Sequence, residues 1–476
     1  MDVLLNVFQT TLLILVVIAV FNLIIFVHEL GHYWAAKWRG LKIDRFQIWF
    51  GKPIWSKTIN GVQYGLGWIP AGGFVALPQM APMEAIEGGN LDREPLPPIK
   101  PLDKIIVAFA GPLFSFLLAV VASVCVWKLG KVPDTINTTT IGWVEPGQPG
   151  EKAGLKAGDR ILAINGNPVT TWAGTLDSVI LNVATSRGQN ISFKVDRPGE
   201  GVKTIDSTFD IPKTAWWQRR AVRQVGIQEA GQGPVKIIAP PTAKSPGERA
   251  GLKEGDIIIA LNGEKITHRE QAMSLIAKAG TDPLQITYSR DGVENTVSAA
   301  PVVPKSGLDQ PKPMLGIAMF QDQYQSDELR FPSPVDQIKE TLKTMWITIS
   351  SVAAPDSSIG IQHLSGPIGI GKVQYNFLLA DHPALRIIAF LVLININLAI
   401  LNMLPFPVLD GGHIVLAIME WIAKRPVRLR LLEYIQLCFV FLLFGVMLYV
   451  SSKDFFDDFG AGRGKKGKAG EIVFPD

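Results

Sequence analysis

The first apolar segment, residues 3–27, contains no charged residue and leads directly into His28-Glu29-Leu30-Gly31-His32. A segment of this length and composition is long enough to cross a lipid bilayer as a helix. Three ionisable residues within five positions are costly at the end of such a segment unless they serve a function. The sequence therefore predicts a membrane protein with a functional site at the end of its first span.

The two histidines stand four positions apart, so they lie on one face of a helix and their imidazoles can hold a single Zn²⁺. Glu29 stands beside them and can take a proton from a water molecule at the metal. Such a short pattern also arises by chance, and a histidine on an apolar face is often only a packed side chain. The cost of ionisable groups in a membrane segment favours the metal site. A metalloprotease core of this kind still needs a third ligand.

Three further segments, at about residues 105–129, 385–404 and 434–450, are also apolar enough to span a bilayer. Lysine and arginine cluster in the loop between the first two spans and in the loop between the last two, which predicts that both loops are cytoplasmic. The termini and the large region between spans two and three are then predicted to be periplasmic. The basic, glycine-rich tail at residues 463–468 disagrees with this orientation. The orientation is assigned from the loops, because a glycine-rich terminal segment is expected to be disordered.

The composition agrees with a chain that is only partly embedded in a membrane. Of the 476 residues 47% are hydrophobic, and the mean hydropathy is +0.23. The net charge of +4 is small for this length, and a nucleic-acid partner is not expected because such binding needs basic residues crowded on one face. Cys125 and Cys438 stand in apolar runs and are predicted to be buried thiols, with no disulfide.

Residues 46–77 carry aromatic and β-branched residues interrupted by glycine, proline and Asn60-Gly61, a pattern that predicts short strands and a β-hairpin. Directly after a zinc helix, such a hairpin can offer an edge strand to an extended peptide, or it can be a plug without substrate contact. Residues 78–101, with proline, glycine and acidic residues, predict a linker.

An internal repeat lies within residues 136–303. Residues 149–166 recur as residues 246–263 at a constant shift of 97 positions. Each copy predicts a short helix, a Gly-Asp turn, a buried strand and an Asn-Gly turn. The pattern resembles the PDZ domain of bacterial envelope proteases, which binds an extended chain or a C-terminus at the edge of a sheet. The two repeats either bind peptides in their grooves or are spacers with empty grooves.

The third span ends in a polar and irregular sequence that contains Asn397, Asn402 and Asp410. Such side chains need polar partners at membrane depth. Pro405 and Pro407 interrupt the helix, which is tolerated there only if protein or a water-filled cavity surrounds the backbone.

Asp410 lies about as far from the start of its span as His28 does from the start of the first, so both are expected at the same level near the cytoplasmic side. Three protein ligands would leave one position open, as in catalytic zinc sites. Asp410 is therefore predicted to be the third ligand. On chemistry alone, His413 competes with it.

These features resemble the site-2 proteases, a family of intramembrane zinc metalloproteases, and within it the bacterial branch with tandem PDZ domains that regulates sigma-E. The resemblance covers nearly the whole chain and rests on HELGH at 28–32, the doubled repeat, and NxxPxPxLDG at 402–411. It implies that His413 has a packing or supporting role. It also implies that His28, His32 and Asp410 bind Zn²⁺, that Glu29 is the catalytic acid/base, and that Asn397 and Asn402 hold the unwound substrate segment.

The resemblance further implies a substrate class and a location. The substrates are single-span membrane proteins already shortened by another protease, such as an anti-sigma factor, and also leftover signal peptides. The PDZ domains would exclude large ectodomains or read a newly made C-terminus. The chain is expected in the bacterial inner membrane, in contact with the lipid bilayer.

The sequence is also compatible in part with three other functions. An inactive zinc-binding PDZ scaffold or chaperone would have no need of Glu29, and a zinc transporter would carry polar residues along several spans. A membrane-anchored protease of soluble proteins would need its catalytic layer to face open water.

The predicted fold class is a polytopic α-helical membrane protein with four transmembrane helices, a membrane-associated β-hairpin and two tandem α+β PDZ domains. Helical spacing also predicts an amphipathic helix at residues 333–354. The predicted divisions are a first span with the zinc motif (1–39), hairpin region and linker (40–104), second span (105–129), first PDZ domain (136–230), second PDZ domain (231–305), amphipathic helix and linker (330–371), third span (384–415), fourth span (430–452) and tail (453–476).

Overall fold

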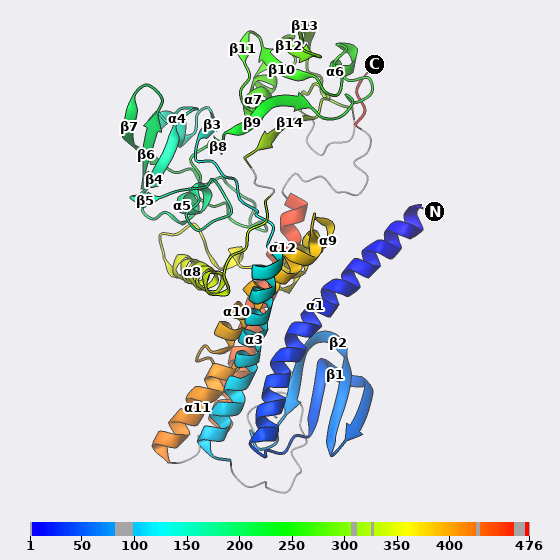
Figure 1. Ribbon diagram of the computed structural model, residues 1–476, viewed down its shortest axis with the longest axis vertical. Helices are drawn as coiled ribbons and strands as arrows, with labels where there is room; N and C mark the ends of the chain where they lie inside the picture. The colour runs from blue at the N-terminus through cyan, green and yellow to red at the C-terminus, as the bar shows by residue number, and fades with distance from the viewer. Residues whose placement is uncertain are drawn as a thin grey trace. The chain divides into compact units, whose positions relative to one another are not determined.

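The computed structural model describes residues 2–80, 99–305, 312–324, 328–424, 429–460 and 472–475. The chain divides into two compact units (Figure 1). Unit one comprises Met1–Val132, Leu329–Trp346 and Ser365–Ser451. Unit two comprises Pro133–Glu328, Ile347–Leu364 and Ser452–Asp476.

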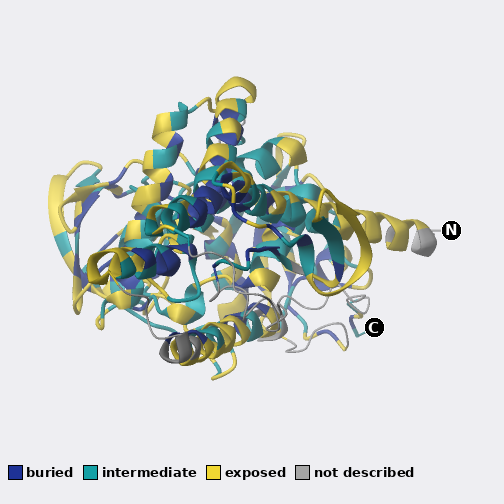
Figure 2. Ribbon diagram, turned by 90° about the horizontal axis from the view of Figure 1, so that it is seen from below, coloured by how far each residue is buried: buried dark blue, intermediate teal, exposed yellow. Residues whose placement is uncertain are grey.

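Within the described residues, four helices are long and apolar enough to cross a membrane, which confirms the predicted number of spans. They are α1 (Asp2–Trp38), α3 (Pro101–Leu129), α10 (Pro383–Asn402) and α12 (Leu429–Gly460). Both α1 and α10 pack against α3. In the N-terminal half of α1, exposed apolar residues include Leu5, Val7, Leu12, Leu15 and Val16, as expected of a surface that faces lipid. The ribbon near the N-terminus is accordingly coloured mostly as exposed in Figure 2.

The predicted hairpin is present as β1 (Arg45–Ile59) and β2 (Val62–Ala76), joined at Asn60 and Gly61, which both have positive φ. The strands are bent, so that residues 45–48 pair with residues 73–76 on one side and with residues 63–66 on the other. The result is a small sheet with four rows in the order 73–76, 45–48, 63–66 and 55–58. Residues 73–76 form one of its two edges.

Two contacts fasten this sheet to the first span. The Tyr33 hydroxyl of α1 lies 2.7 Å from the Tyr64 hydroxyl of β2. The indole Nε1–H of Trp49 donates to Asn22 Oδ1 of α1 over 2.5 Å. Trp49 has a φ of 68°, a rare value for a bulky residue. The backbone of β1 is therefore strained at this bend, and the surrounding contacts must hold it there.

Unit two contains the two repeats, each with its own apolar core. In the first repeat, β5-β4-β6-β7 form one sheet and β3-β8 form another. In the second repeat the strand order is β13-β12-β10-β9-β14, with β11 paired to β10. The elements of the first repeat are β3 (Ile141–Val144), α4 (Pro149–Ala153), β4 (Arg160–Ile164), β5 (Asn167–Pro168), α5 (Val179–Thr185), β6 (Asn190–Arg197), β7 (Gly201–Thr208) and β8 (Ile227–Glu229). Those of the second are β9 (Gly231–Ile237), α6 (Pro246–Arg249), β10 (Ile257–Leu261), β11 (Glu264–Lys265), α7 (Arg269–Ala279), β12 (Leu284–Arg290), β13 (Val293–Ala299) and β14 (Met319–Gln323).

The second repeat extends further than the predicted boundary at residue 305. Its sheet is completed by β14, which pairs with β9 at the start of the repeat. The sequence repeat does not include this strand, because β14 returns to the sheet from beyond the last duplicated residues.

Each repeat contains an equivalent ion pair between a buried aspartate and a partly exposed arginine, Asp159 with Arg197 in the first and Asp256 with Arg290 in the second. In both pairs the two carboxylate oxygens accept from Nε and Nη2 of the arginine, at 2.7–2.8 Å. The aspartate belongs to the Gly-Asp turn of the repeated sequence. The arginine ends the strand opposite, so this Asp–Arg clamp closes the turn onto the sheet.

The clamp makes the stability of the second repeat depend on pH. Burial alone raises the pKa of the Asp256 carboxyl, but hydrogen bonds from Arg290 and from the Lys253 N–H outweigh burial and hold that pKa below its ordinary value. A lowered folded-state pKa contributes stability that is present above the ordinary aspartate pKa of about 3.9 and is lost as the pH falls below it. The protection of the β10 and β12 amides against hydrogen exchange in the full chain, measured relative to the intrinsic exchange rate at each pH, should therefore fall in acid.

The matched variant for this pH effect is Asp256→Asn, which keeps the shape of the side chain and removes its charge. It should lower the free energy of opening of the second repeat by about 2–3 kcal/mol near pH 7. It should also flatten the dependence on pH between pH 5 and 3. An unchanged acid response in Asp256→Asn would show that another carboxylate controls it.

The remaining helices are α8 (Pro334–Ala353), the short 3-10 helix η1 (Ile361–His363), α9 (Pro367–Leu379) and α11 (Asp410–Ala423). Helix α8 agrees with the amphipathic helix expected at 333–354, whereas α9 begins at the end of the predicted linker (330–371) and continues beyond it to Leu379. The region predicted as a single third span at 384–415 is divided into α10 and α11 at its prolines. Helix α12 continues to Gly460, into the predicted tail.

Other expectations have mixed outcomes. Cys125 and Cys438 are free thiols, but Cys125 is only partly buried and Cys438 is exposed, so the predicted burial is wrong for Cys438 and only partly met for Cys125. Most of the predicted linker at 78–101 and the basic tail at 463–468 lie outside the described residues. Near the C-terminus, Phe474 is buried and the Val473 carbonyl accepts from the Lys305 N–H at 2.7 Å, so this end of the chain packs on the second repeat.

Candidate metal centre

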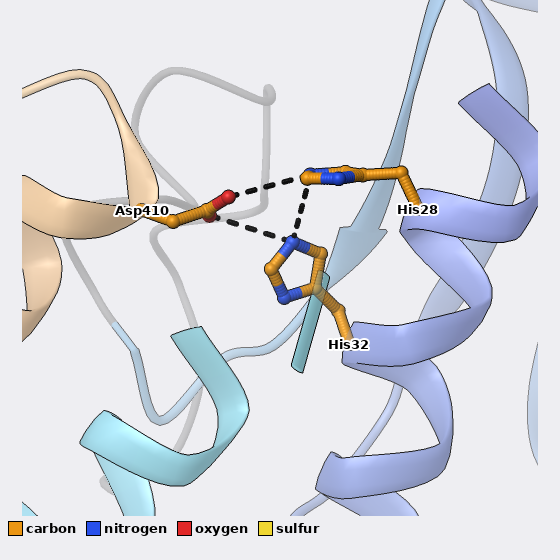
Figure 3. A group of neighbouring side chains, drawn as sticks. All are labelled: His28, His32 and Asp410. Atoms are coloured by element: carbon orange, nitrogen blue, oxygen red, sulfur yellow. Dashed lines mark hydrogen bonds and ion pairs between the residues drawn. The ribbon is translucent and has the colours of Figure 1, made fainter. Parts of the chain in front are cut away.

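Three side chains from two helices meet inside unit one (Figure 3). His28 and His32 lie on α1, and Asp410 is the first residue of α11. The Nε2 atoms of the two imidazoles are 3.3 Å apart, and they lie 3.3 and 3.4 Å from the Asp410 carboxylate oxygens. All three side chains are buried, and the three form a group that could hold a metal ion.

These separations suit a tetrahedral zinc ion. Zinc binds imidazole nitrogen and carboxylate oxygen at about 2.0–2.1 Å, so neighbouring ligand atoms of a tetrahedral site are about 3.3–3.4 Å apart. The two Nε2 atoms have this spacing, and each lies at this distance from one Asp410 oxygen, His28 from Oδ2 and His32 from Oδ1. With one ligand atom from each residue, the three atoms lie within 4.8 Å of one another. Two neutral imidazoles and one carboxylate are a donor set that zinc prefers, and three ligands leave a fourth position for water or substrate.

The far side of each imidazole is held by α3. His32 Nδ1–H donates to the Val107 carbonyl oxygen over 2.8 Å, which fixes the tautomer and leaves Nε2 free to bind a metal. His28 Nδ1 lies 3.0 Å from the Ser115 hydroxyl, and Ser115 is fully buried. The second span therefore orients both histidines although it supplies no ligand.

Helix α3 also forms a wall of the centre at Gly111. A Cβ atom at this position would overlap His32 Nε2 and would lie 2.9 Å from His28 Nε2. Because Gly111 has no side chain, the space beside the two Nε2 atoms stays open for a metal ion.

Asp410 is positioned by the break between α10 and α11. Helix α10 ends at Asn402, and the backbone turns through residues 403–409 before α11 begins at Asp410. Gln436 of α12 donates from Nε2 to the Pro407 carbonyl oxygen at 3.1 Å. Lys104 of α3 pairs with Glu420 of α11 at 2.7 Å, which ties α11 to the second span.

The other predicted residues are placed differently with respect to the cluster. Glu29 directly follows His28, and a Cβ on Gly73 would lie 3.2 Å from Glu29 Cγ, so the edge row 73–76 passes beside Glu29. The Asn402 Nδ2 atom lies 3.3 Å from His28 Nε2. Asn397 has a buried Oδ1 without a hydrogen-bond partner in the described residues, and no described hydrogen bond joins it to the cluster. His413 is buried on α11, outside the group of three ligands.

Two functional residues were missed by the sequence analysis, Gly111 and Ser115. The available signals were Gly111-Pro112 and a lone hydroxyl within an apolar span. Neither signal indicates a metal site, because the roles of both residues come from packing of α3 against α1.

Ser115→Ala should weaken zinc binding by about 10–100-fold, the usual effect of losing a group that orients a metal-bound histidine. The reason is that His28 would lose the hydrogen bond to Nδ1 and with it a fixed ring orientation. Competition against a chelator of known affinity measures the change. Ser123→Ala is the matched control, since Ser123 is an equally buried serine of α3 whose hydroxyl donates to the Val120 carbonyl oxygen of its own helix. Equal zinc affinities in the two variants would contradict this role for Ser115.

Comparison with known proteins adds to this geometry. A model of peptidase family M50 matches residues 16–446. A relative from Neisseria meningitidis named as a zinc metalloprotease is 30% identical, over 92% of this chain and 96% of its own. The protease RseP of Yersinia pestis is 27% identical over 91% of this chain and 96% of its own, and the regulator of sigma-E protease RseP of Salmonella typhimurium is 27% identical over 90% and 95%.

Among solved structures, the PDZ domain of the SdrC-like protein from Listeria innocua is similar to part of this chain. The match covers 20% of this chain and all of the Listeria domain. The identity is 16% and the TM-score 0.17.

Proposed function

The chain belongs to peptidase family M50 and is a multi-pass membrane zinc metalloprotease, and from this premise we propose that it cuts single-span membrane proteins within their membrane-spanning segments. The observation that supports this proposal best is the metal centre itself. Both histidine ligands belong to the candidate span Val7–Trp38, and both are oriented by the candidate span Pro101–Leu129. A site built from the walls of membrane helices is suited to a substrate that is also in the membrane.

His28, His32 and Asp410 would hold the zinc ion, which when bound polarises a water molecule and the scissile carbonyl. Glu29 is the group on this chain placed to accept the proton of that water and to pass it to the leaving nitrogen. The Asn402 amide lies against His28 Nε2, so it is placed to donate a hydrogen bond to the substrate carbonyl oxygen.

A transmembrane substrate must be unwound before it can be cut, because its amides are hydrogen-bonded within its own helix. The edge row 73–76 passes beside Glu29 and can supply replacement hydrogen bonds to an extended segment. The Oδ1 atom of Asn397, which has no hydrogen-bond partner among the described residues, can accept another. This arrangement favours the interpretation of the hairpin as a substrate strand partner over that of a plug.

The substrates we propose are membrane proteins whose outer domains have already been removed by another protease, such as an anti-sigma factor, and remnant signal peptides. The resemblance to regulators of sigma-E supports the first class. The two repeats would guard the entrance, by excluding large ectodomains or by binding the new C-terminus. In this proposal the repeats and both termini are periplasmic, and the metal centre lies near the cytoplasmic side of a bacterial inner membrane.

A cleavage assay with the purified full chain in detergent tests the proposed activity. The substrate is a single-span protein with a short external stub, and mass spectrometry locates the cut. A cut inside the spanning segment is expected. Cleavage confined to soluble peptides would overturn the intramembrane proposal.

Removal of the repeats should widen the choice of substrate. Lys131 and Arg330 are joined by two backbone hydrogen bonds of 2.8 and 3.0 Å, so the two ends of a deletion between them can be closed by a short linker. We expect the wild type to cut only the short-stub substrate, and the deletion variant to cut also a substrate with its complete ectodomain. Unchanged selectivity, with equal cleavage of the short-stub substrate, would contradict a guarding role.

A further inference from the structure

The first repeat carries a long loop between β7 and β8 that has no role in the metal centre. Asp210 and Gln224 close its base through two backbone hydrogen bonds of 2.8 and 3.0 Å. Trp216 in this loop is 86% exposed and its neighbour Trp217 is 42% exposed, and their rings meet edge to face with centroids 5.6 Å apart. Two adjacent exposed indoles form a patch of the kind that marks a binding surface.

Several hydrogen bonds hold the loop in one conformation, and this conformation exposes its two indoles. The Arg223 guanidinium donates to the Ser186 carbonyl oxygen at 2.6 Å and to the Asp356 carbonyl oxygen at 2.7 Å. His363 Nε2 lies 2.7 Å from the Arg220 carbonyl oxygen. Near the tip, the Gln218 N–H donates to the Ala215 carbonyl oxygen at 3.0 Å.

The same loop is fastened to the last turns of the fourth candidate span. The Lys453 ammonium donates to the carbonyl oxygens of Trp216 and Gln218, at 2.7 and 3.2 Å. Asp454 pairs with Arg219. Lys453 and Asp454 are 6% and 5% exposed, and both lie inside the candidate span Tyr434–Phe456. All of these residues belong to unit two.

These contacts locate the loop relative to a bilayer. Charged residues within a span are tolerated where it reaches the interface or where they find polar partners, and the loop backbone supplies such partners here. A loop bound to the end of a span lies at the level where that span leaves the hydrocarbon region. Tryptophan is enriched at this level of membrane proteins, because its ring is apolar and its N–H can be hydrated.

The surroundings of the loop have the same character. Phe455 and Phe456, at the end of the span, also expose their rings. Lys213 and Arg220 are exposed on the loop, and basic residues at a membrane surface attract anionic lipid headgroups. Aromatic and basic side chains gathered at one span end are the composition of a membrane interface.

We propose that Trp216 and Trp217 anchor the first repeat in the headgroup layer of the bilayer. The partner is the lipid surface, with Lys213 and Arg220 facing anionic headgroups. The anchor fixes the first repeat next to the membrane and does not depend on the proposed protease activity.

The test measures the depth of single nitroxide labels in the full chain, reconstituted in lipid nanodiscs after Cys125→Ala and Cys438→Ala. One variant carries Trp216→Cys and the control carries Val202→Cys, an exposed apolar position on β7 of the same repeat. The measured quantity is the ratio of label collisions with oxygen to label collisions with a water-soluble nickel complex. We expect this ratio to be severalfold higher at position 216 than at position 202. Equal, water-like ratios at both positions would overturn the proposal. A label at 216 that is immobile but inaccessible to lipid would indicate a protein partner and overturn it as well.

A second measurement needs no label. Lipids brominated near the headgroup should quench the fluorescence of the wild type more than that of Trp216→Phe, because the replaced indole is one that they reach. Adding phosphatidylglycerol to phosphatidylcholine nanodiscs should increase this difference, and Lys213→Gln with Arg220→Gln should remove the increase. Equal quenching of wild type and Trp216→Phe would count against the anchor.

Discussion

Glu29→Gln should abolish peptide cleavage while the protein keeps its full complement of zinc. Glutamine has the size of glutamate but cannot accept a proton from water, so the loss is expected to reach at least the roughly 10²–10⁴-fold that general acid–base catalysis supplies. Glu29 is not one of the three residues of the candidate ligand group, so zinc should remain bound. The measurement pairs a cleavage assay with metal analysis of the same preparation.

The control for Glu29→Gln is Glu340→Gln. Glu340 is an exposed carboxylate of α8 in the same unit, 3.9 Å from Lys131 and outside the group of three candidate ligands. It should retain most of the cleavage activity. Cleavage by Glu29→Gln at the rate of this control would remove Glu29 from the mechanism, and loss of zinc from Glu29→Gln would mean that the residue supports the metal.

Gly111→Ala should remove both zinc and activity, although it adds only one methyl group to an apolar span. The added Cβ would overlap His32 Nε2 and crowd His28 Nε2, so the two imidazoles could no longer meet at one ion. Three protein ligands are needed for a catalytic zinc site, and displacement of the two histidines leaves only Asp410. Metal analysis after purification should find little zinc in this variant.

A second glycine in a membrane helix provides the comparison for Gly111. Gly445 lies in α12, and a Cβ there would meet no atom within 4 Å. Gly445→Ala should therefore keep zinc, activity and yield. A Gly111→Ala protein that bound zinc normally would show that α3 can move away from the histidines and that it does not wall the centre.

The parts of the site that were predictable from sequence are those with local signals. His28 and His32 share a helix face because of their spacing, and Asp410 stands out as a carboxylate after a broken membrane helix. Ser115 and Gly111 have no such signal, since a serine or glycine in an apolar span is usually a packing residue. Their roles come from the contact of α3 with α1, and a single sequence does not specify that contact.

The fold shows the same division. The hairpin was predictable because its strand residues are interrupted by turn residues, but its four rows depend on the positive φ of Trp49, which propensity disfavours. In the second repeat, β14 joins β9 from a distant part of the chain. Long-range pairing of this kind leaves no periodic signal near either strand.

The Asp–Arg clamp, present once in each repeat, bears on how such a protein can evolve. Because each copy has its own clamp and its own core, damage to one copy is contained within it. If the repeats bind peptides as proposed, selection can then alter the groove of one repeat while the other keeps its original peptide preference. In that case a chimera that takes one repeat from a relative should acquire the relative's preference in the exchanged repeat alone.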